Sequence, residues 1–247
     1  MTDGFAAAAV ALLDLTDLSE TADEAGLTKL CERALTPLGP VAAVCIWPRF
    51  VAAAQHRLAG TPVKVATVVN FPAGTTDVMA TVTETDRAVA DGADEIDLVL
   101  PYRAVLAGEA ETAAALVRSV RDRVPTGRLL KVILETGELG RADHIADAAR
   151  IAIDAGADFI KTSTGKTSVS ATPEAARIML EAIRSFGRRV GFKASGGIRT
   201  QADAGTYLAL AEAVMGQGWP RPETFRFGAS GLLDALLAAP AASDNAS

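Results

Sequence analysis

Short runs rich in β-branched residues alternate with longer alanine-rich stretches along the 247 residues of the chain, and this alternation restricts the possible folds most strongly. Eight runs are strand candidates, at 11–15, 41–47, 63–69, 94–100, 129–135, 158–162, 190–194 and 224–228. Helical stretches separate them, at 21–36, 48–59, 76–91, 109–123, 140–155, 173–187, 201–216 and 230–238. Strands that alternate with helices form a parallel sheet joined by right-handed crossovers. Eight such units predict an α/β fold of the (β/α)8, or TIM, barrel type rather than an open doubly wound sheet.

The barrel is predicted to form one domain. No linker or low-complexity segment divides the chain, so we expect a single catalytic domain over 1–240 and a polar tail at 241–247. The N-terminal segment MTDGFAAAAVALLDL has no basic region before its apolar stretch, and we interpret it as a short helix leading into the fold rather than as a signal peptide. No G-x-G-x-x-G motif follows the first strand candidate, which argues against a dinucleotide-binding fold.

Composition argues against several classes of function. A net charge of −6 and a pI near 5.0 disfavour a surface for nucleic acid or anionic membranes. No run of 18 or more uncharged apolar residues occurs, so we expect no membrane span and a cytoplasmic location. An acidic protein that acts on an anionic substrate must then build a local positive pocket.

The cysteines and histidines form no recognisable metal or disulfide motif. Cys31 and Cys45 are not a CxxC pair, and His56 and His144 lack the spacing of zinc ligands. We therefore expect no disulfide framework, no zinc site and no cofactor, although the sequence stays compatible with an oxygen-ligated Mg²⁺.

Lysines are rare in this arginine-rich chain, yet four of the six lie within strand candidates. A lysine inside an apolar strand lowers the stability of the fold unless its charge is paired, so an unpaired one is expected to have a chemical role. Lys64 and Lys131 lie in the N-terminal halves of their strands, and we expect them to form ion pairs at the barrel floor. Lys161 and Lys193 lie near the C-terminal ends, where the active sites of (β/α)8 enzymes are found.

Two amines that converge at the barrel mouth can activate one another. A lysine must lose its proton to act as a nucleophile, and lowering its pKa by about 3 requires about 4 kcal/mol in favour of the neutral amine. Burial and a neighbouring cation supply such a shift. We assign Lys161 as the nucleophile and Lys193 as its electrostatic neighbour, although spacing alone allows the exchanged roles.

Two aspartates are candidate partners of these amines. Asp97 lies between Ile96 and Leu98 in EIDLVL, so it is expected to point into the barrel, where it could pair with a lysine and move protons. A structural ion pair is the alternative. Asp14 makes a similar but weaker case, whereas Asp94 and Glu95 are expected to be solvated.

Three loops that follow late strand candidates are rich in small residues and could bind phosphate. Backbone N–H groups and helix N-termini after the last two strands often hold phosphate in such barrels. The candidate binding residues are Thr164, Gly165, Lys166, Gly196, Gly197, Gly228, Ser230 and Gly231.

Taken in order, eight segments resemble the deoxyribose-phosphate aldolase family of class I aldolases. They are LLDLTDL (12–18), AAVCIWPRFV (42–51), VATVVNFPAG (65–74), GADEIDLVLPY (92–102), LLKVILETGEL (129–139), ADFIKTSTGK (157–166), VGFKASGGIRT (190–200) and FRFGASGLL (225–233). The resemblance implies a lyase that reversibly cleaves 2-deoxy-D-ribose 5-phosphate to D-glyceraldehyde 3-phosphate and acetaldehyde in deoxyribonucleoside breakdown, and it makes a homodimer plausible.

The resemblance also implies individual roles. Lys161 matches the Schiff-base lysine of the family, Lys193 its second active-site lysine, and Asp97 its proton-transferring aspartate. Asp14 matches a further polar residue of the site. Cys45 matches a cysteine near the family's substrate pocket.

The chain departs from the family pattern at two places. Gly231 stands where members often have serine, which removes one hydroxyl donor to phosphate, and the chain ends in SDNAS without the C-terminal tyrosine of some members. Another class I sugar-phosphate aldolase, a transaldolase-like barrel and a phosphate-binding isomerase are alternatives. A barrel that only binds a sugar phosphate is the non-enzymatic alternative.

Overall fold

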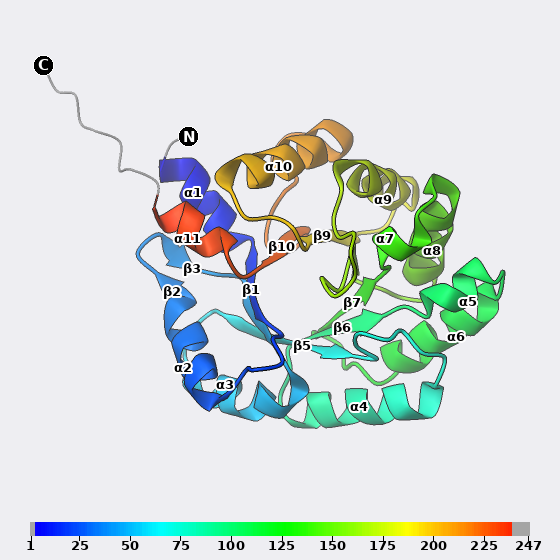
Figure 1. Ribbon diagram of the computed structural model, residues 1–247, viewed down its shortest axis with the longest axis horizontal. Coiled ribbons are helices and arrows are strands. Elements are labelled where there is room, and N and C mark those ends of the chain that lie inside the picture. Colours follow the sequence, from blue (N-terminus) through cyan, green and yellow to red (C-terminus); the bar gives the residue numbers. More distant parts are fainter. Residues whose placement is uncertain (1–2, 239–247) are drawn as a thin grey trace, which may run out of the picture.

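Eight parallel strands close into a barrel in the computed structural model, which describes residues 3–238 (Figure 1). Around the barrel, with β10 beside β1, the strands are β1 (Leu13–Asp17), β4 (Ala43–Ile46), β5 (Lys64–Val69), β6 (Glu95–Val99), β7 (Leu129–Ile133), β8 (Phe159–Lys161), β9 (Gly191–Ser195) and β10 (Phe225–Ala229). The predicted (β/α)8 barrel is confirmed. The predicted tail at 241–247 lies outside the described residues, and a single domain over 1–240 stays a prediction.

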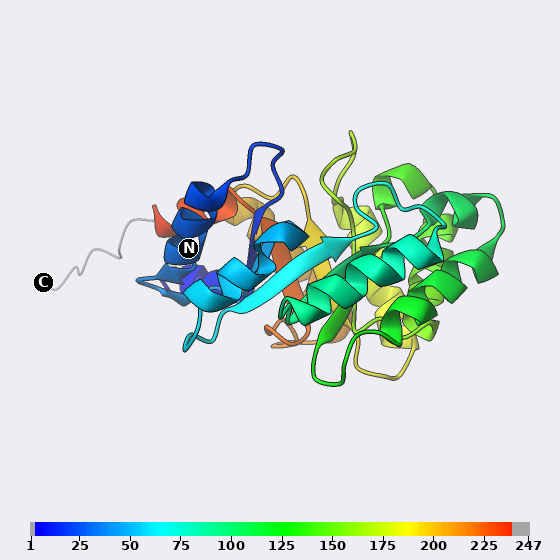
Figure 2. The same cartoon turned by 90° about the horizontal axis from the view of Figure 1, so that it is seen from below.

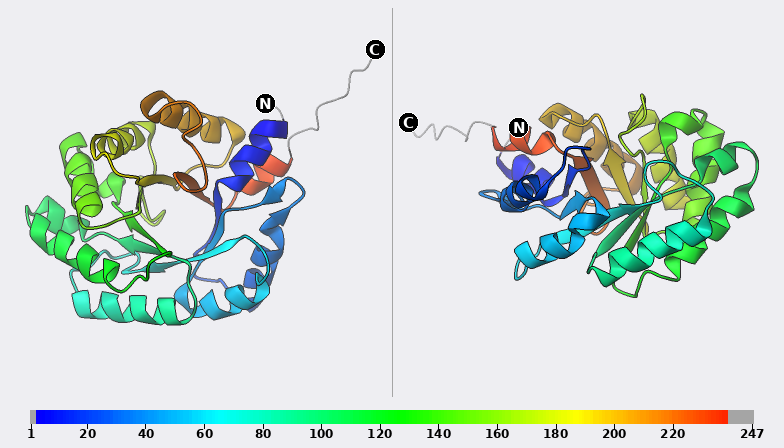
Figure 3. Two further views of the ribbon diagram at one scale, coloured as in Figure 1. Left: turned by 180° about the vertical axis from the view of Figure 1, so that it is seen from behind. Right: turned by 60° about the horizontal axis from the view of Figure 1, so that its bottom comes forward.

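Helices surround the barrel and match the predicted stretches (Figures 1 and 3). They are α2 (Glu24–Arg33), the 3-10 turn η1 (Pro48–Phe50) with α3 (Val51–Arg57), α4 (Val78–Ala90), α6 (Ala110–Arg121), α8 (Ala142–Asp154), α9 (Pro173–Ser185), α10 (Gln201–Met215) and α11 (Leu232–Leu237). The expected N-terminal helix is α1 (Asp3–Ala11), which packs against α11. The first strand therefore begins at Leu13, two residues later than predicted.

Short elements that the sequence did not predict complete the fold. They are the hairpin strands β2 (Leu35–Thr36) and β3 (Gly39–Pro40), and the one-turn helices α5 (Tyr102–Leu106) and α7 (Thr136–Leu139). Each has too few residues to show a hydrophobic period. No helix within residues 3–238 is long and apolar enough to cross a membrane.

Helix caps follow local side-chain chemistry. Thr172 accepts a hydrogen bond from Ala175 N (3.1 Å), with Pro173 at the first helical position. Helix α2 begins at Glu24 rather than at position 21, because Asp23 is its N-cap and the Asp23 carboxylate accepts from Gly26 N (2.7 Å). These caps fix where each helix begins, and so the length of the loop before it.

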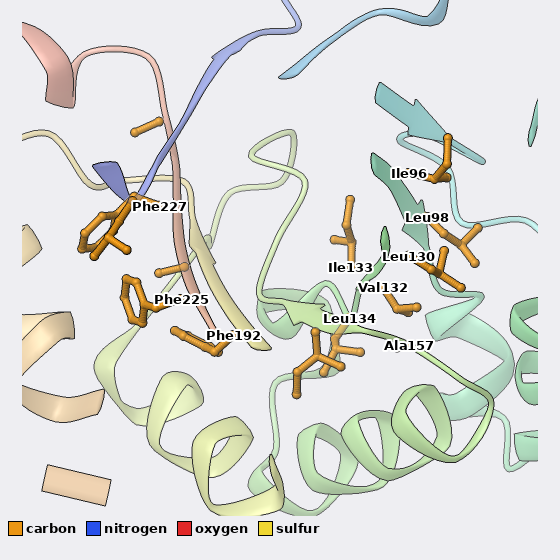
Figure 4. Packing of buried hydrophobic residues seen from close by; sticks show 14 of the residues in the cluster. Ile96, Leu98, Leu130, Val132, Ile133, Leu134, Ala157, Phe192, Phe225 and Phe227 are labelled. Atoms are coloured by element: carbon orange, nitrogen blue, oxygen red, sulfur yellow. The ribbon is translucent and has the colours of Figure 1, made fainter. Parts of the chain in front are cut away.

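The main apolar core lies between the barrel strands and the surrounding helices. Figure 4 shows Phe192 of β9 beside Phe225 and Phe227 of the neighbouring strand β10. The ring centroids are 5.7 Å apart for Phe192–Phe225 and 4.8 Å apart for Phe225–Phe227. These rings face outward, toward the helices. Because side chains alternate along a strand, their sequence neighbours Lys193 and Arg226 point into the barrel.

The barrel interior has an apolar side and a charged side. Small apolar residues of β4 and β5 cluster with Leu18, namely Ala43, Cys45, Ala66 and Val68. The remaining strands, β1 and β6 to β10, contribute buried charged residues, which fill the space that branched aliphatic residues usually occupy. The interior of this barrel is therefore an ionic site as well as a core.

Candidate active site

Asp97 lies at the centre of the charged side and contacts three lysines. Its Oδ2 is 2.9 Å from Lys161 Nζ and 2.8 Å from Lys193 Nζ, and its Oδ1 is 2.8 Å from Lys131 Nζ. All four side chains are buried. The two predicted lysines and the predicted aspartate thus meet at one point, because Lys161 and Lys193 occupy paired positions on β8 and β9.

A second group of charges lies beside this centre. Asp14 Oδ2 is 2.6 Å from Lys193 Nζ, and Asp14 Oδ1 is 2.6 Å from Arg226 Nη1. Glu95 pairs with Arg226 Nη2 (2.9 Å) and with Lys131 Nζ (2.5 Å). These contacts join seven buried ionisable side chains into one network.

The network corrects two expectations about the barrel floor. Glu95 is buried and doubly paired rather than solvated, because it lies two residues before Asp97 on β6 and therefore shares its inward face, and Asp94 is half-buried and accepts from Val65 N (2.9 Å). Lys131 forms the predicted ion pairs. Lys64 does not: it is exposed at the start of β5 and forms no ion pair with residues 3–238.

The two site lysines differ in their pKa directions. Burial lowers the pKa of Lys161, Asp97 opposes this change and Lys193 reinforces it. Burial acts on Lys193 in the same sense, but the carboxylates of Asp14 and Asp97 outweigh it and raise the pKa of Lys193. Lys161 is therefore the more readily deprotonated amine, and Lys193 stays cationic.

The carboxylates are held in their ionised form. Burial would raise the pKa of Asp97, but the attraction of Lys131, Lys161 and Lys193 keeps it well below the ordinary range. The pKa of Asp14 is lowered in the same way, since Lys193 and Arg226 outweigh burial. Asp97 is consequently ionised, which is the state that a proton acceptor must have, and it readily returns any proton that it accepts.

Backbone contacts fix the spacing of the two amines. Ser195 N donates to Thr162 Oγ1 (3.0 Å), and that hydroxyl donates to Ser195 O (3.2 Å), so the C-terminal ends of β8 and β9 are joined just beyond Lys161 and Lys193. On the other side, Gly228 leaves room for Lys193, since a Cβ there would lie 2.9 Å from Lys193 Cε.

A pocket of about 790 Å³ opens at the C-terminal mouth of the barrel; Ser195 and Gly228, next to Lys193, line it, whereas Lys161, Lys193 and Asp97 are not part of its lining. All the loop residues predicted to bind phosphate line it: Thr164, Gly165, Lys166, Gly196, Gly197, Gly228, Ser230 and Gly231. The loops after β1 and β8 project from this same end of the barrel (Figure 2). Cys45 is the exception, because it is buried inside the barrel with its Sγ 4.0 Å from Asp97 Oδ2, and burial raises the pKa of its thiol.

The pocket is locally basic, although the chain as a whole is acidic. A protein of this composition needs such a pocket to bind an anionic substrate. Lys166 and Arg199 line it from the loops, and Lys29 and Arg33 line it from α2, against one acidic residue, Asp17. Lys29 and Arg33 were missed from the sequence, although their spacing of four residues places them on one helix face. Such a pocket favours an anionic ligand.

Glu135 anchors the loop that carries Lys166. Its buried carboxylate accepts from Thr164 Oγ1 (2.5 Å) and Thr164 N (3.3 Å), and its own backbone is left-handed (φ 58°). The Lys166 ammonium donates to Leu18 O (2.8 Å). Sequence reasoning missed Glu135, because it falls at a strand end where no period indicates burial.

The arrangement is suited to chemistry on a carbonyl compound that bears an anionic group. A deprotonatable amine, an ionised carboxylate in contact with it and a persistent cation lie below a basic pocket. No group of three or more His, Cys, Asp or Glu side chains in residues 3–238 is arranged to hold a metal ion.

Comparison with known proteins gives a consistent result. Residues 8–236 match the family model of DeoC/LacD family aldolases. Over 233 residues the chain is 54% identical to a deoxyribose-phosphate aldolase of Agrobacterium fabrum, covering 94% of this chain and 90% of that protein.

Solved structures show the same similarity. A crystal structure assigned to a deoxyribose-phosphate aldolase of Coccidioides immitis superposes with a TM-score of 0.84 at 31% identity, over 94% of this chain and 85% of that one. A structure assigned to the same enzyme of Toxoplasma gondii gives a TM-score of 0.87 at 26% identity, over 95% of this chain and 93% of the other.

Proposed function

The chain belongs to the DeoC/LacD family of aldolases, and we propose that it is a lyase that reversibly cleaves 2-deoxy-D-ribose 5-phosphate to D-glyceraldehyde 3-phosphate and acetaldehyde. The observation that carries the proposal is the buried Lys161 Nζ 2.9 Å from Asp97 Oδ2, beneath the barrel mouth at which a basic pocket opens. An amine whose pKa is lowered by burial can form an imine with the aldehyde carbon of the sugar.

In this mechanism Lys161 attacks C1 of the open-chain sugar. Asp97 accepts a proton from the nitrogen and returns it to the departing hydroxyl, so water leaves and an iminium ion forms. The iminium draws the electrons of the C2–C3 bond as the 3-hydroxyl gives its proton to the Asp97 carboxylate, and glyceraldehyde 3-phosphate departs. The remaining enamine takes that proton at C2, and water then hydrolyses the iminium and releases acetaldehyde from Lys161.

Lys193 and the pocket loops support this chemistry without bonding to the sugar carbon. Lys193 stays cationic between Asp14 and Asp97, so it disfavours a second positive charge on Lys161. The substrate phosphate would lie among the glycine-rich loops, where Gly196 and Gly197 adopt positive φ values (87° and 82°) that turn the backbone toward the pocket.

Trapping the imine tests the proposal directly. Borohydride added with acetaldehyde should reduce the imine to an ethyl group on Lys161, located by peptide mass spectrometry. Lys161→Arg should abolish both the adduct and turnover while keeping the fold, whereas Lys64→Arg, at an exposed lysine of the opposite barrel end, should change neither. An adduct on Lys193 alone would exchange the two roles, and no adduct on any lysine would refute the mechanism.

A parallel trap with a ketone donor tests the substrate class. Dihydroxyacetone should leave little adduct on Lys161 relative to acetaldehyde; a ketone adduct of equal yield would instead indicate a transaldolase-like enzyme.

A homodimer and a cytoplasmic location complete the proposal. Light scattering on the purified chain tests the former, and a structure of the enzyme from Aeropyrum pernix, 24% identical to this chain, is described as tetrameric.

A further inference from the structure

Two members of the buried network lie on the side of it away from the proposed reaction. Glu95 and Arg226 line a second pocket, of about 650 Å³, together with residues at the N-terminal ends of the strands. Neither residue contacts Lys161. Arg226 lies 5.7 Å from the ring of Phe159, which stands two residues before Lys161 on β8.

Contacts nevertheless connect these residues to the nucleophile. Asp14 forms ion pairs with both Arg226 and Lys193. Lys193 and Lys161 in turn both contact Asp97 Oδ2. Glu95 reaches the same Asp97 through Lys131. These ion pairs therefore form a continuous buried path from Arg226 and Glu95, at the second pocket, to Lys161.

The network is electrically balanced only when Lys161 is neutral. It contains the carboxylates Asp14, Glu95 and Asp97, and the cations Lys131, Lys193 and Arg226, whose charges cancel. A protonated Lys161 adds one uncompensated positive charge to this buried set. Excess buried charge is costly, so the balance itself favours the free amine.

Two further ionisable groups of the barrel interior lie outside this ion-pair network. Cys45, on β4, is a buried thiol whose pKa is raised by burial, and it stays uncharged. Glu135, at the end of β7, directs its carboxylate to Thr164 and Thr167 and forms no ion pair within residues 3–238.

We propose that Arg226 and Glu95 are positioning residues that act on Lys161 through the network, by setting the net charge that surrounds it from the far end of the barrel. The proposal rests on Lys161 being the nucleophile of the proposed function. It assigns a role to two side chains that contact neither the substrate pocket nor the reacting amine.

The strand register gives the size of the effect. Lys161, Lys193 and Arg226 occupy paired positions on three successive strands, which lie about 4.8 Å apart, so Arg226 is roughly 10 Å from Lys161 at the backbone. With an effective dielectric constant of about 20, one unit charge at that distance changes the ionisation equilibrium of a lysine roughly tenfold, or by about one pH unit.

The test follows the rate of acetaldehyde trapping on Lys161 as a function of pH. The rate should rise with pH as Lys161 becomes neutral, and its inflection reports the ionisation of that amine. Arg226→Met, which removes a cation, should move the inflection about one pH unit upward, and Glu95→Gln, which removes an anion, should move it downward. The double variant restores the balance and should return to the wild-type inflection.

Arg226→Lys is the matched control, since it keeps the charge and loses the guanidinium hydrogen bonds; its inflection should match the wild type even if its rate falls. If Arg226→Met does not fold, Glu95→Gln and Arg226→Lys still test the inference, because both substitutions nearly keep the size of the side chain. The inference is overturned if folded Glu95→Gln has the same inflection as the wild type. It is also overturned if Arg226→Lys displaces the inflection as much as Arg226→Met does. Absence of any adduct on wild-type Lys161 refutes the proposed function instead.

Discussion

Gly228→Ala tests whether backbone space beside Lys193 is required for activity. An ideal Cβ at Gly228 would lie 2.6 Å from Ser195 Oγ and 2.9 Å from Lys193 Cε, whereas ordinary contacts begin at 3.4 Å. The Ser195 hydroxyl can rotate away. Lys193 cannot move freely, because its Nζ is held 2.6 Å from Asp14 and 2.8 Å from Asp97.

The lysine must therefore shift by about half an ångström, or the end of β10 must move. Overpacking of this kind costs about 1–3 kcal/mol of folding free energy. For a chain of this size, a loss of 1 kcal/mol lowers Tm by about 2–4 °C. Since a displacement of about 1 Å in a site can reduce the rate about 100-fold, we expect kcat to fall about 10- to 100-fold.

Gly231→Ala is the matched control, three residues further along the chain, between β10 and α11. No atom lies within 4 Å of a Cβ at Gly231, and both glycines line the same pocket. Calorimetry and steady-state cleavage of 2-deoxyribose 5-phosphate would be measured on both variants. If Gly228→Ala keeps the kcat and Tm of Gly231→Ala, the steric argument for Lys193 is wrong.

Further predictions concern the carboxylates, the phosphate loop and metals. Asp97→Asn should lower kcat by about 10²- to 10⁴-fold, the usual contribution of a positioned acid–base group, and a change below tenfold in steady-state assays would remove Asp97 from that role. Gly231→Ser should lower KM for the phosphorylated substrate by adding a hydroxyl donor where space is open, whereas KM for unphosphorylated deoxyribose should not change. Because the pKa values of Asp14 and Asp97 are lowered in the folded state, their stabilisation is present above the unfolded value near 3.8 and is lost as pH falls below it. Urea titrations between pH 6 and pH 3, at steps of about one unit, should show the midpoint falling at the acid end, and less steeply for Asp14→Asn. EDTA should leave turnover unchanged, since the proposed imine chemistry involves no metal; loss of activity that Zn²⁺ restores would contradict it.

The sequence determined the barrel and the identity of its central amines. The eight strand candidates, and the helices between them, can be read from local periodicity because each strand buries its own apolar face. Lys161 and Lys193 were placed near strand ends, and parallel strands in a barrel bring those ends to one mouth. Glycine-rich loops were predicted to line a pocket at that mouth, and they do.

Only the tertiary structure decided which charges meet. Period-two alternation indicates that Glu95, Lys131 and Arg226 can face inward, but it does not give the height of each residue in the barrel. That height depends on the stagger between strands, which positions Glu95 against Arg226 and turns a residue expected in solvent into a buried partner. Ion pairing across the barrel joins residues far apart in the chain, so no local pattern in the sequence reports it.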